Sequence, residues 1–180
     1  MLCKGIGVKE DRLAAFKWFQ KSVEKNNAKA LYYIGIYYYN GSGPIERDHQ
    51  QARIYFKRSA ELGHVEAMVS FAQICQEKLK ENSSSLSSTE IDSLQSESLK
   101  WYTKAAKQDH TTALRELGRL YGAKGDDKTS SECYLKASNL NDALSTLFLG
   151  GYYENGQGVT KNKQTALKYY IKAIELGQPT

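Results

Sequence analysis

A short pattern that begins with a cation recurs five times, and this repetition constrains the fold more than any other feature. It reads KSVEKNN (21–27), RSAELGH (58–64), KAAKQDH (104–110), KASNLND (136–142) and KAIELGQ (172–178), with steps of 37, 46, 32 and 36 residues between the cations. Repetition at this period is typical of solenoids, in which each repeat packs only against its neighbours. We therefore expect a stack of similar modules.

Landmarks around each cation predict a helix, which we call helix B of the repeat. A small residue lies six positions before the cation and an apolar or aromatic pair lies two and three positions before it, which places both on one helical face. Five positions after the cation lies a residue type that tolerates the left-handed backbone conformation, which commonly closes helices. We expect that conformation at Asn26, Gly63, Asp109, Asn141 and Gly177.

A second helix, helix A, is predicted over 28–41, 65–78, 111–124 and 143–156. These segments share an apolar residue followed by a small one, at Ile34-Gly35, Phe71-Ala72, Leu117-Gly118 and Leu149-Gly150. Glycine inside a helix costs about 1 kcal/mol relative to alanine. Its use in three of these four helices indicates that a neighbouring helix approaches closely there.

Three G-x-G sequences join helix A to helix B, at Gly5-x-Gly7, Gly41-x-Gly43 and Gly156-x-Gly158. A phosphate-binding loop would follow a buried strand, and no strand pattern precedes any of them. We therefore expect tight bends in which glycine supplies backbone freedom. The following helix B is expected to begin with an N-cap at Asp11, Asp48 or Asn162.

Composition excludes several classes of function. The net charge of +5 comes from scattered lysines without a basic block, so we expect no nucleic-acid binding. No apolar run reaches the roughly 18 residues of a membrane span, so no membrane insertion is expected. The N-terminus lacks the apolar core of a signal peptide, which favours an intracellular location; the localisation is otherwise unknown.

No catalytic, cofactor-binding or metal-binding pattern is present, so we expect a protein that is not an enzyme and uses no cofactor. Cys75 and Cys133 stand at aromatic positions of the repeat and are expected to be small buried hydrophobes, and Cys3 lies beside the first bend. His64 and His110 share one repeat position before helix A, where capping or solvation is expected rather than metal binding.

The pattern resembles the Sel-1-like repeat, a relative of the tetratricopeptide repeat. The signature A-x-x-x-L-G-x-x-Y-x-x-G-x-G-V-x-x-D, then A-x-x-W-Y-x-K-A-A-E-x-G, is followed closely by residues 28–63 and 145–177 and by the half repeat 2–26. The resemblance implies an all-α, right-handed α-solenoid (superhelix) of about four and a half antiparallel helix-pair repeats in one domain, 1–180. The repeats are 1–27, 28–64, 65–110, 111–141 and 142–180.

The third repeat contains a serine-rich insertion at residues 80–98, with eight serines. Such polar composition predicts a disordered or weakly helical surface loop. Ser87 and Thr89 each precede an acidic residue by three positions, so an inert spacer and a phosphorylated segment both remain open.

A stripe along the helix A segments is the candidate binding site, because helix A lines the concave side of helix-pair solenoids. It begins aromatic, then carries amides, then arginines, which suits a peptide with an apolar anchor and an acidic end. The alternative is that some of its tyrosines only complete the packing between repeats. The stripe comprises Tyr32, Ile36, Tyr39, Val69, Gln73, Gln76, Arg115 and Arg119.

The resemblance implies a scaffold or adaptor whose partners are other proteins, bound in this groove. Cysteine-rich members of the family carry a disulfide in each repeat and have been linked to β-lactam binding or hydrolysis, so a β-lactam-recognising enzyme is one alternative. The missing cysteine pairs count against it. A structural segment of a larger multidomain protein is the other alternative.

Overall fold

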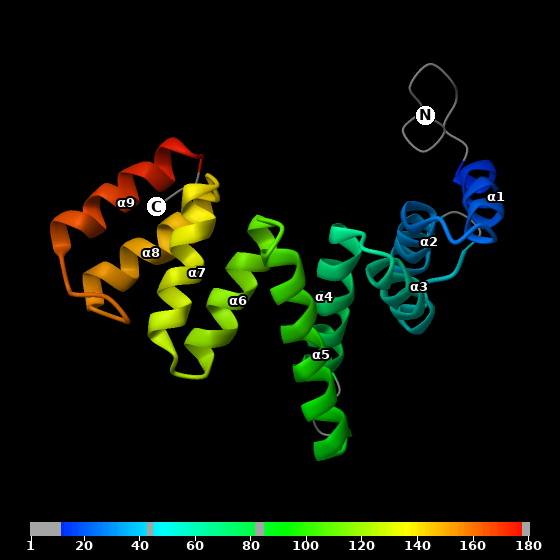
Figure 1. Cartoon of the computed structure of the whole chain (residues 1–180), viewed down its shortest axis with the longest axis horizontal. Helices are drawn as coiled ribbons and strands as arrows, with labels where there is room; N and C mark the ends of the chain where they lie inside the picture. Colours follow the sequence, from blue (N-terminus) through cyan, green and yellow to red (C-terminus); the bar gives the residue numbers. More distant parts are fainter. Residues whose placement is uncertain (1–11, 43–44, 82–84, 178–180) are drawn as a thin grey trace. The chain divides into compact units, whose positions relative to one another are not determined.

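The computed structural model describes residues 12–42, 45–81 and 85–177, and these form nine α-helices and no strand (Figure 1). The predicted all-α repeat fold is confirmed. Helix A of the successive repeats corresponds to α2, α4, α6 and α8, and helix B to α1, α3, α5, α7 and α9. The helices are α1 (Arg12–Val23), α2 (Ala28–Asn40), α3 (His49–Glu61), α4 (Val65–Glu81), α5 (Ser88–Ala106), α6 (Thr111–Ala123), α7 (Asp127–Asn139), α8 (Ala143–Asn155) and α9 (Lys163–Glu175).

The chain divides into two compact units, unit 1 (Met1–Trp101) and unit 2 (Tyr102–Thr180). In unit 1, α2 packs against α1 and α3, and α3 also packs against α4. In unit 2, α7 packs against α6 and α8, and α8 also packs against α9. Helix α5 contributes residues to both units. That residues 1–180 act as one domain with the predicted repeat boundaries stays a prediction.

The backbone takes the left-handed conformation at all five positions where the sequence predicts it. The φ angles are 51° at Asn26, 56° at Asp109 and 62° at Asn141, and 91° and 93° at Gly63 and Gly177. Each of these residues follows a helix B by one to three positions, so the predicted helix stops are confirmed.

The N-caps of helix B are confirmed where the structure describes them. Asp48 accepts hydrogen bonds from the backbone N–H groups of Gln50 and Gln51, both at 2.9 Å. Asn162 accepts one from Thr165 at 3.0 Å. The third predicted cap, Asp11, lies outside the described residues.

The bend at Gly156-x-Gly158 is also confirmed, and its two glycines have different roles. Gly156 closes α8 with φ 78°, and its N–H donates to the carbonyl of Tyr152 at 2.8 Å. Gly158, with φ 63°, lies against the first residues of α7, where an added Cβ would overlap Asp127 and approach the Lys128 nitrogen to 2.6 Å. Gly5, Gly7 and Gly43 lie outside the described residues.

Three glycines inside helix A, namely Gly35, Gly118 and Gly150, each face an aromatic ring of helix B in the same repeat. A Cβ added at Gly35 would lie 2.6 Å from the Phe56 ring. At Gly118 the distance to the Tyr134 ring would be 2.7 Å, and at Gly150 the distance to the Tyr170 ring would be 2.5 Å. The close approach predicted from these glycines is therefore confirmed. In each case an aromatic ring of helix B, and not its backbone, occupies the space where a side chain would lie.

A second ring of helix B stacks on a helix A tyrosine one turn beyond the glycine. Tyr38 and Tyr55 stack with centroids 5.6 Å apart and ring planes 7° apart. Tyr153 and Tyr169 stack at 5.4 Å and 18°. The same contact thus recurs in unit 1 and in unit 2, at the same repeat positions.

The prediction of a surface loop for the serine-rich insertion is wrong for most of its length. Helix α4 continues to Glu81 and α5 begins at Ser88, so residues 88–98 are helical. Leu94 is 4% exposed and Ser98 is fully buried, which anchors this part of α5 in unit 1. Residues 82–84 lie outside the described part of the chain.

A capping box explains why a serine-rich segment forms a helix here. The Ser87 N–H donates to Glu90 Oε2 at 3.0 Å, and the Glu90 N–H donates to Ser87 Oγ at 3.3 Å. The Ser87 N–H and the Ser87 hydroxyl both donate to the Glu90 carboxylate, which lowers the pKa of Glu90. Ser-x-x-Glu before an apolar periodicity is a known helix start. The same two residues suggested phosphorylation from the sequence, and that alternative stays a prediction.

We expect Gly150→Ala to destabilise the protein and Gly151→Ala to leave it unchanged or more stable. Both changes gain about 1 kcal/mol of helix propensity. Only at position 150 does the methyl overlap a ring, and overpacking costs about 1–3 kcal/mol; at position 151 the nearest atom is the Tyr170 hydroxyl oxygen, at 3.8 Å. Urea unfolding followed by circular dichroism measures both, and equal stabilities would contradict the packing role of Gly150.

We expect Ser87→Ala to cost about 1 kcal/mol, because an N-cap hydroxyl is lost. Amide hydrogen exchange at residues 89–91 should become faster, since the first turn of α5 loses its cap. Ser93→Ala is the matched control, as it changes an exposed serine inside the same helix. Unchanged protection in Ser87→Ala would show that packing alone holds the start of α5.

Candidate partner-binding surface

Unit 1 contains a hollow of about 180 Å³ between α2, α3 and α4. Three residues of the predicted stripe line it, namely Ile36 and Tyr39 from α2 and Gln73 from α4. The sequence analysis did not identify the remaining lining residues. These are Asn40, Ser70 and the buried Phe56, which comes from helix B and which helical periodicity assigns to the core.

Tyr39 is held in place on both ends of its side chain. Its hydroxyl donates to Glu77 Oε1 at 2.7 Å. Its ring stacks on His49, with centroids 5.0 Å apart and planes 9° apart. The hydrogen bond to Glu77 and burial raise the pKa of Tyr39 to about 12, so the hydroxyl stays protonated and remains a donor at neutral pH.

Tyr32 is partly exposed on the same helix and stacks on His64, with ring centroids 4.7 Å apart. The Nδ1 atom of His64 accepts a hydrogen bond from the Ala67 N–H at 3.3 Å, which caps α4. Burial lowers the pKa of His64, which favours the neutral ring that can accept this bond. The capping role predicted for His64 is therefore confirmed, and the histidine also fixes Tyr32.

Two other members of the stripe contribute to packing in unit 1. Val69 is 5% exposed, so its side chain is in the interior. Gln76 Nε2 donates to the buried Ser98 Oγ at 2.7 Å, which joins α4 to α5. Ser98 belongs to the segment 80–98 that the sequence analysis assigned to a loop, so the contact of Gln76 was not foreseen.

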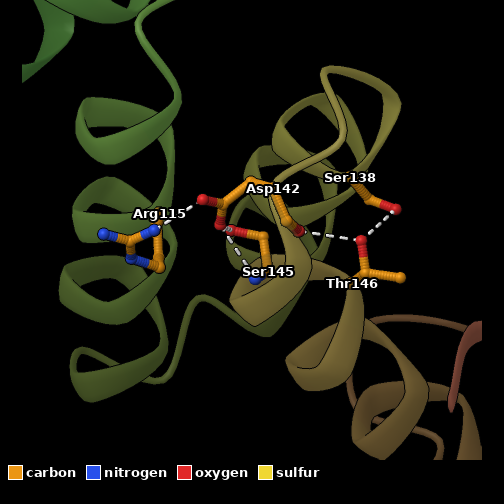
Figure 2. A network of polar contacts seen from close by, with 5 residues as sticks. All are labelled: Arg115, Ser138, Asp142, Ser145 and Thr146. Carbon is orange, nitrogen blue, oxygen red and sulfur yellow. Dashed lines mark hydrogen bonds and ion pairs between the residues drawn. The ribbon is translucent and has the colours of Figure 1, made fainter. Parts of the chain in front are cut away.

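In unit 2, Arg115 makes an ion pair with Asp142, with 2.6 Å between Arg115 Nη1 and Asp142 Oδ1 (Figure 2). The other carboxylate oxygen of Asp142 accepts from the backbone N–H of Ser145 at 2.9 Å and from its hydroxyl at 2.6 Å. Asp142 is thus the N-cap of α8 and also the counter-ion of Arg115.

The network continues into the core of unit 2 through two fully buried hydroxyls. Thr146 Oγ1 lies 2.8 Å from the Asp142 carbonyl and 2.9 Å from Ser138 Oγ (Figure 2). Lys172 Nζ from α9 donates to the Ser138 carbonyl at 2.8 Å. These contacts connect α6, α7, α8 and α9. The sequence offered one signal for them: Asp142 occupies the repeat position of Asn27, His64 and His110, just before helix A.

Arg119 differs from Arg115 although it lies only one turn further along α6. It pairs with Glu116 of its own helix at 2.9 Å, and its side chain is 44% exposed. Exposed pairs of this kind contribute about 0–1 kcal/mol. Of the two arginines in the predicted stripe, Arg119 is therefore the one whose charge is at the surface.

The two cysteines within the described residues differ in burial. Cys75 is fully buried, as predicted, and burial raises its pKa to about 11. Cys133 is only partly buried, and both thiols are free. Cys3 lies outside the described residues. Within the described ranges, no three histidine, cysteine or carboxylate side chains are grouped to hold a metal ion.

No helix in the described part of the chain combines the length and apolar character that a membrane crossing requires.

We expect Arg115→Ala to destabilise unit 2 by about 1–2 kcal/mol, because a partly buried charged hydrogen bond is lost. Arg119→Ala is the matched control on the same helix, and we expect it to change stability by less than about 0.5 kcal/mol. Thermal and urea unfolding measure both variants. Equal effects of the two substitutions would contradict a structural role for the Arg115–Asp142 pair.

Comparisons with known proteins agree with this architecture. The family model described as Sel1 repeat matches residues 1–27, 28–64, 91–110, 111–142 and 143–178. The chitin synthase regulator SKT5 of Saccharomyces cerevisiae is 27% identical over 172 residues, which cover 90% of this chain. The chain spans only 23% of the length of that relative.

Two solved structures are similar in fold. A Sel1 repeat protein from Oxalobacter formigenes superposes with a TM-score of 0.80 at 25% identity, covering 99% of this chain and 70% of that one. The cysteine rich protein B of Helicobacter pylori gives a TM-score of 0.50 at 27% identity, covering 73% of this chain and 90% of that one. Proteins built from Sel1 repeats generally act in protein–protein interaction, and this chain belongs to the Sel1 repeat family.

Proposed function

We propose that this chain is a non-enzymatic interaction module that binds a peptide segment of a partner protein, as a scaffold or adaptor. The observation that carries the proposal is the hollow of unit 1, where Ile36 and Tyr39 surround the buried ring of Phe56. One apolar side chain of the partner would enter this hollow. Burying a side chain of that size contributes about 1.5–3 kcal/mol, which suits a hot spot within a larger contact.

The walls of the hollow are fixed before any partner arrives, which supports binding rather than a purely structural role. Tyr39, which lines the hollow, is held by Glu77 and His49, and Tyr32 on the same helix is held by His64. Side chains that are already ordered lose less conformational entropy on binding, which leaves more of the contact energy as affinity. The alternative, in which these tyrosines only complete the packing, accounts for their rings but not for the hollow beside Tyr39.

An acidic end of the partner would contact Arg119 rather than Arg115. Arg115 is neutralised by Asp142, whereas the exposed Arg119 is paired with Glu116 of its own helix. We therefore assign any electrostatic contact on α6 to Arg119. Such a contact at the rim would act on the association rate and its salt dependence more than on the dissociation rate.

The relatives favour an adaptor over an enzyme. SKT5 is named as a regulator of chitin synthase, and this chain matches less than a quarter of it, so its partner is not assigned to this chain. The β-lactam alternative gains no support, because Cys75 and Cys133 are free and lie in different compact units. The alternative of a segment of a larger protein is compatible with the proposed binding role.

A selection from a displayed random-peptide library tests the proposal. We expect the unmodified chain to enrich peptides with a common apolar anchor and Ile36→Asp to lose them, because a carboxylate in the hollow would have to be desolvated. Ile54→Asp is the matched control, since Ile54 is 46% exposed on α3 and does not line the hollow.

A second variant keeps the test informative if Ile36→Asp does not fold. Gln73→Trp changes an exposed residue at the rim and covers the hollow without removing any core contact. Circular dichroism verifies that each variant is folded. Undiminished binding of the enriched peptides by both folded variants would refute the proposal.

A further inference from the structure

The fourth repeat lacks one aromatic ring that the other repeats possess. Three positions before the cation, the repeats carry Trp18, Tyr55, Trp101, Cys133 and Tyr169. Tyr55 and Tyr169 stack on tyrosines of helix A, as described above. The fourth repeat keeps the helix A tyrosine, Tyr121, but a cysteine stands opposite it.

In the third repeat the cysteine and the aromatic ring exchange helices. There the cysteine is on helix A, at Cys75, and the ring is on helix B, at Trp101. Cys75 is fully buried and Trp101 is 4% exposed, with its ring at the edge of Phe71. In the third repeat both positions are therefore buried.

In the fourth repeat nothing within the described residues fills the corresponding space. A hollow of about 280 Å³ lies between the end of α5, α6 and α7, all within unit 2. Leu114, Leu117 and Tyr121 of α6 and Cys133 of α7 form its apolar walls. Ligand pockets for whole small molecules begin at roughly 300 Å³, so this hollow has the size of one or two side chains.

We propose that this hollow binds an aromatic side chain from an acidic segment of a partner protein. The incoming ring would lie beside Tyr121, where the ring of helix B lies in the second and fifth repeats. Offset or tilted aromatic pairs contribute about 0.5–1.5 kcal/mol beyond the area they bury. The proposal concerns a second site, because these walls lie on a different face of α6 from Arg115 and Arg119 and in a different unit from Ile36.

The charges at the rim specify the flanking residues of the partner. Lys107 and Lys136 line the hollow from α5 and α7, and Glu132 is its one acidic lining residue. Acidic neighbours of the anchor would meet the two ammonium groups. A second copy of this chain fits less well, because its exposed Trp18 is flanked by Lys17 and Lys21, which would bring cations to cations.

Three pentapeptides with blocked ends test the site: tryptophan between two pairs of glutamates, alanine in the same context, and tryptophan between two pairs of lysines. We expect the first to bind in a calorimetric or fluorescence titration, and the other two to bind at least about tenfold more weakly. Equal binding of the two tryptophan peptides would contradict the proposal that the partner segment is acidic. No binding of either would overturn the site.

The variant Cys133→Tyr restores the ring that the repeat pattern expects. It should fill the hollow and keep or raise the thermal midpoint of unfolding. Binding of the glutamate–tryptophan peptide should become at least about tenfold weaker. Leu135→Tyr adds the same ring at an exposed position of α7 outside the hollow and is the matched control, with binding retained. Ile36→Asp should also bind this peptide normally, which separates this inference from the proposed function of unit 1.

Thiol labelling of the chain with Cys3→Ser tests the site without altering its walls. Burial raises the pKa of Cys133, so labelling should be slow but measurable, and the fully buried Cys75 is the internal reference. The glutamate–tryptophan peptide should slow the labelling of Cys133 alone. Unchanged labelling at saturating peptide would overturn the proposal. So would self-association in sedimentation that both Cys133→Tyr and Trp18→Ala abolish, because a second copy would then be the occupant.

Discussion

The contact between a glycine of helix A and a ring of helix B determines how closely the two helices of a repeat approach. It recurs at Gly35 with Phe56 in unit 1, and at Gly118 with Tyr134 and Gly150 with Tyr170 in unit 2. A flat ring against bare backbone has a large contact area and little freedom to move. The shapes of the ring and the backbone therefore determine how the two helices pack. The other features, including the stacked tyrosines and the bend one turn further on, depend on that spacing.

Much of the fold was predictable because the relevant signals are local and repeated. A left-handed residue, an N-cap or a bend glycine is recognised from a few neighbouring residues, and each recurs in the same register in three or more repeats. The serine-rich segment was mispredicted because its composition hid a helix period. Ser87 and Glu90 form a capping box whose pattern also fits a phosphorylation site, and only the buried Leu94 and Ser98 decide for a helix.

The candidate surface was predictable only in part, because helical periodicity assigns a residue to a face but not to a neighbour. Ile36, Tyr39 and Gln73 line one hollow, whereas Val69 is buried and Gln76 contacts α5. Arg115 was predicted to contact the ligand. Its partner in the structure, Asp142, lies 27 positions away and therefore cannot be recognised from the neighbouring residues. A pair that joins one repeat to the next leaves no trace in the pattern of either repeat alone.

Because of the position of Gly158, a single repeat as defined by the sequence is not a unit that can be transplanted from one array into another. The bend at Gly158 belongs to the fifth repeat but rests on the backbone of Asp127 in the fourth, with no room for a side chain. A transplanted module would therefore bring a loop shaped for the helix that preceded it in its original setting. Recombination between such arrays is expected to succeed where the donor and recipient share that preceding helix start, and domain shuffling would act on overlapping pairs of modules.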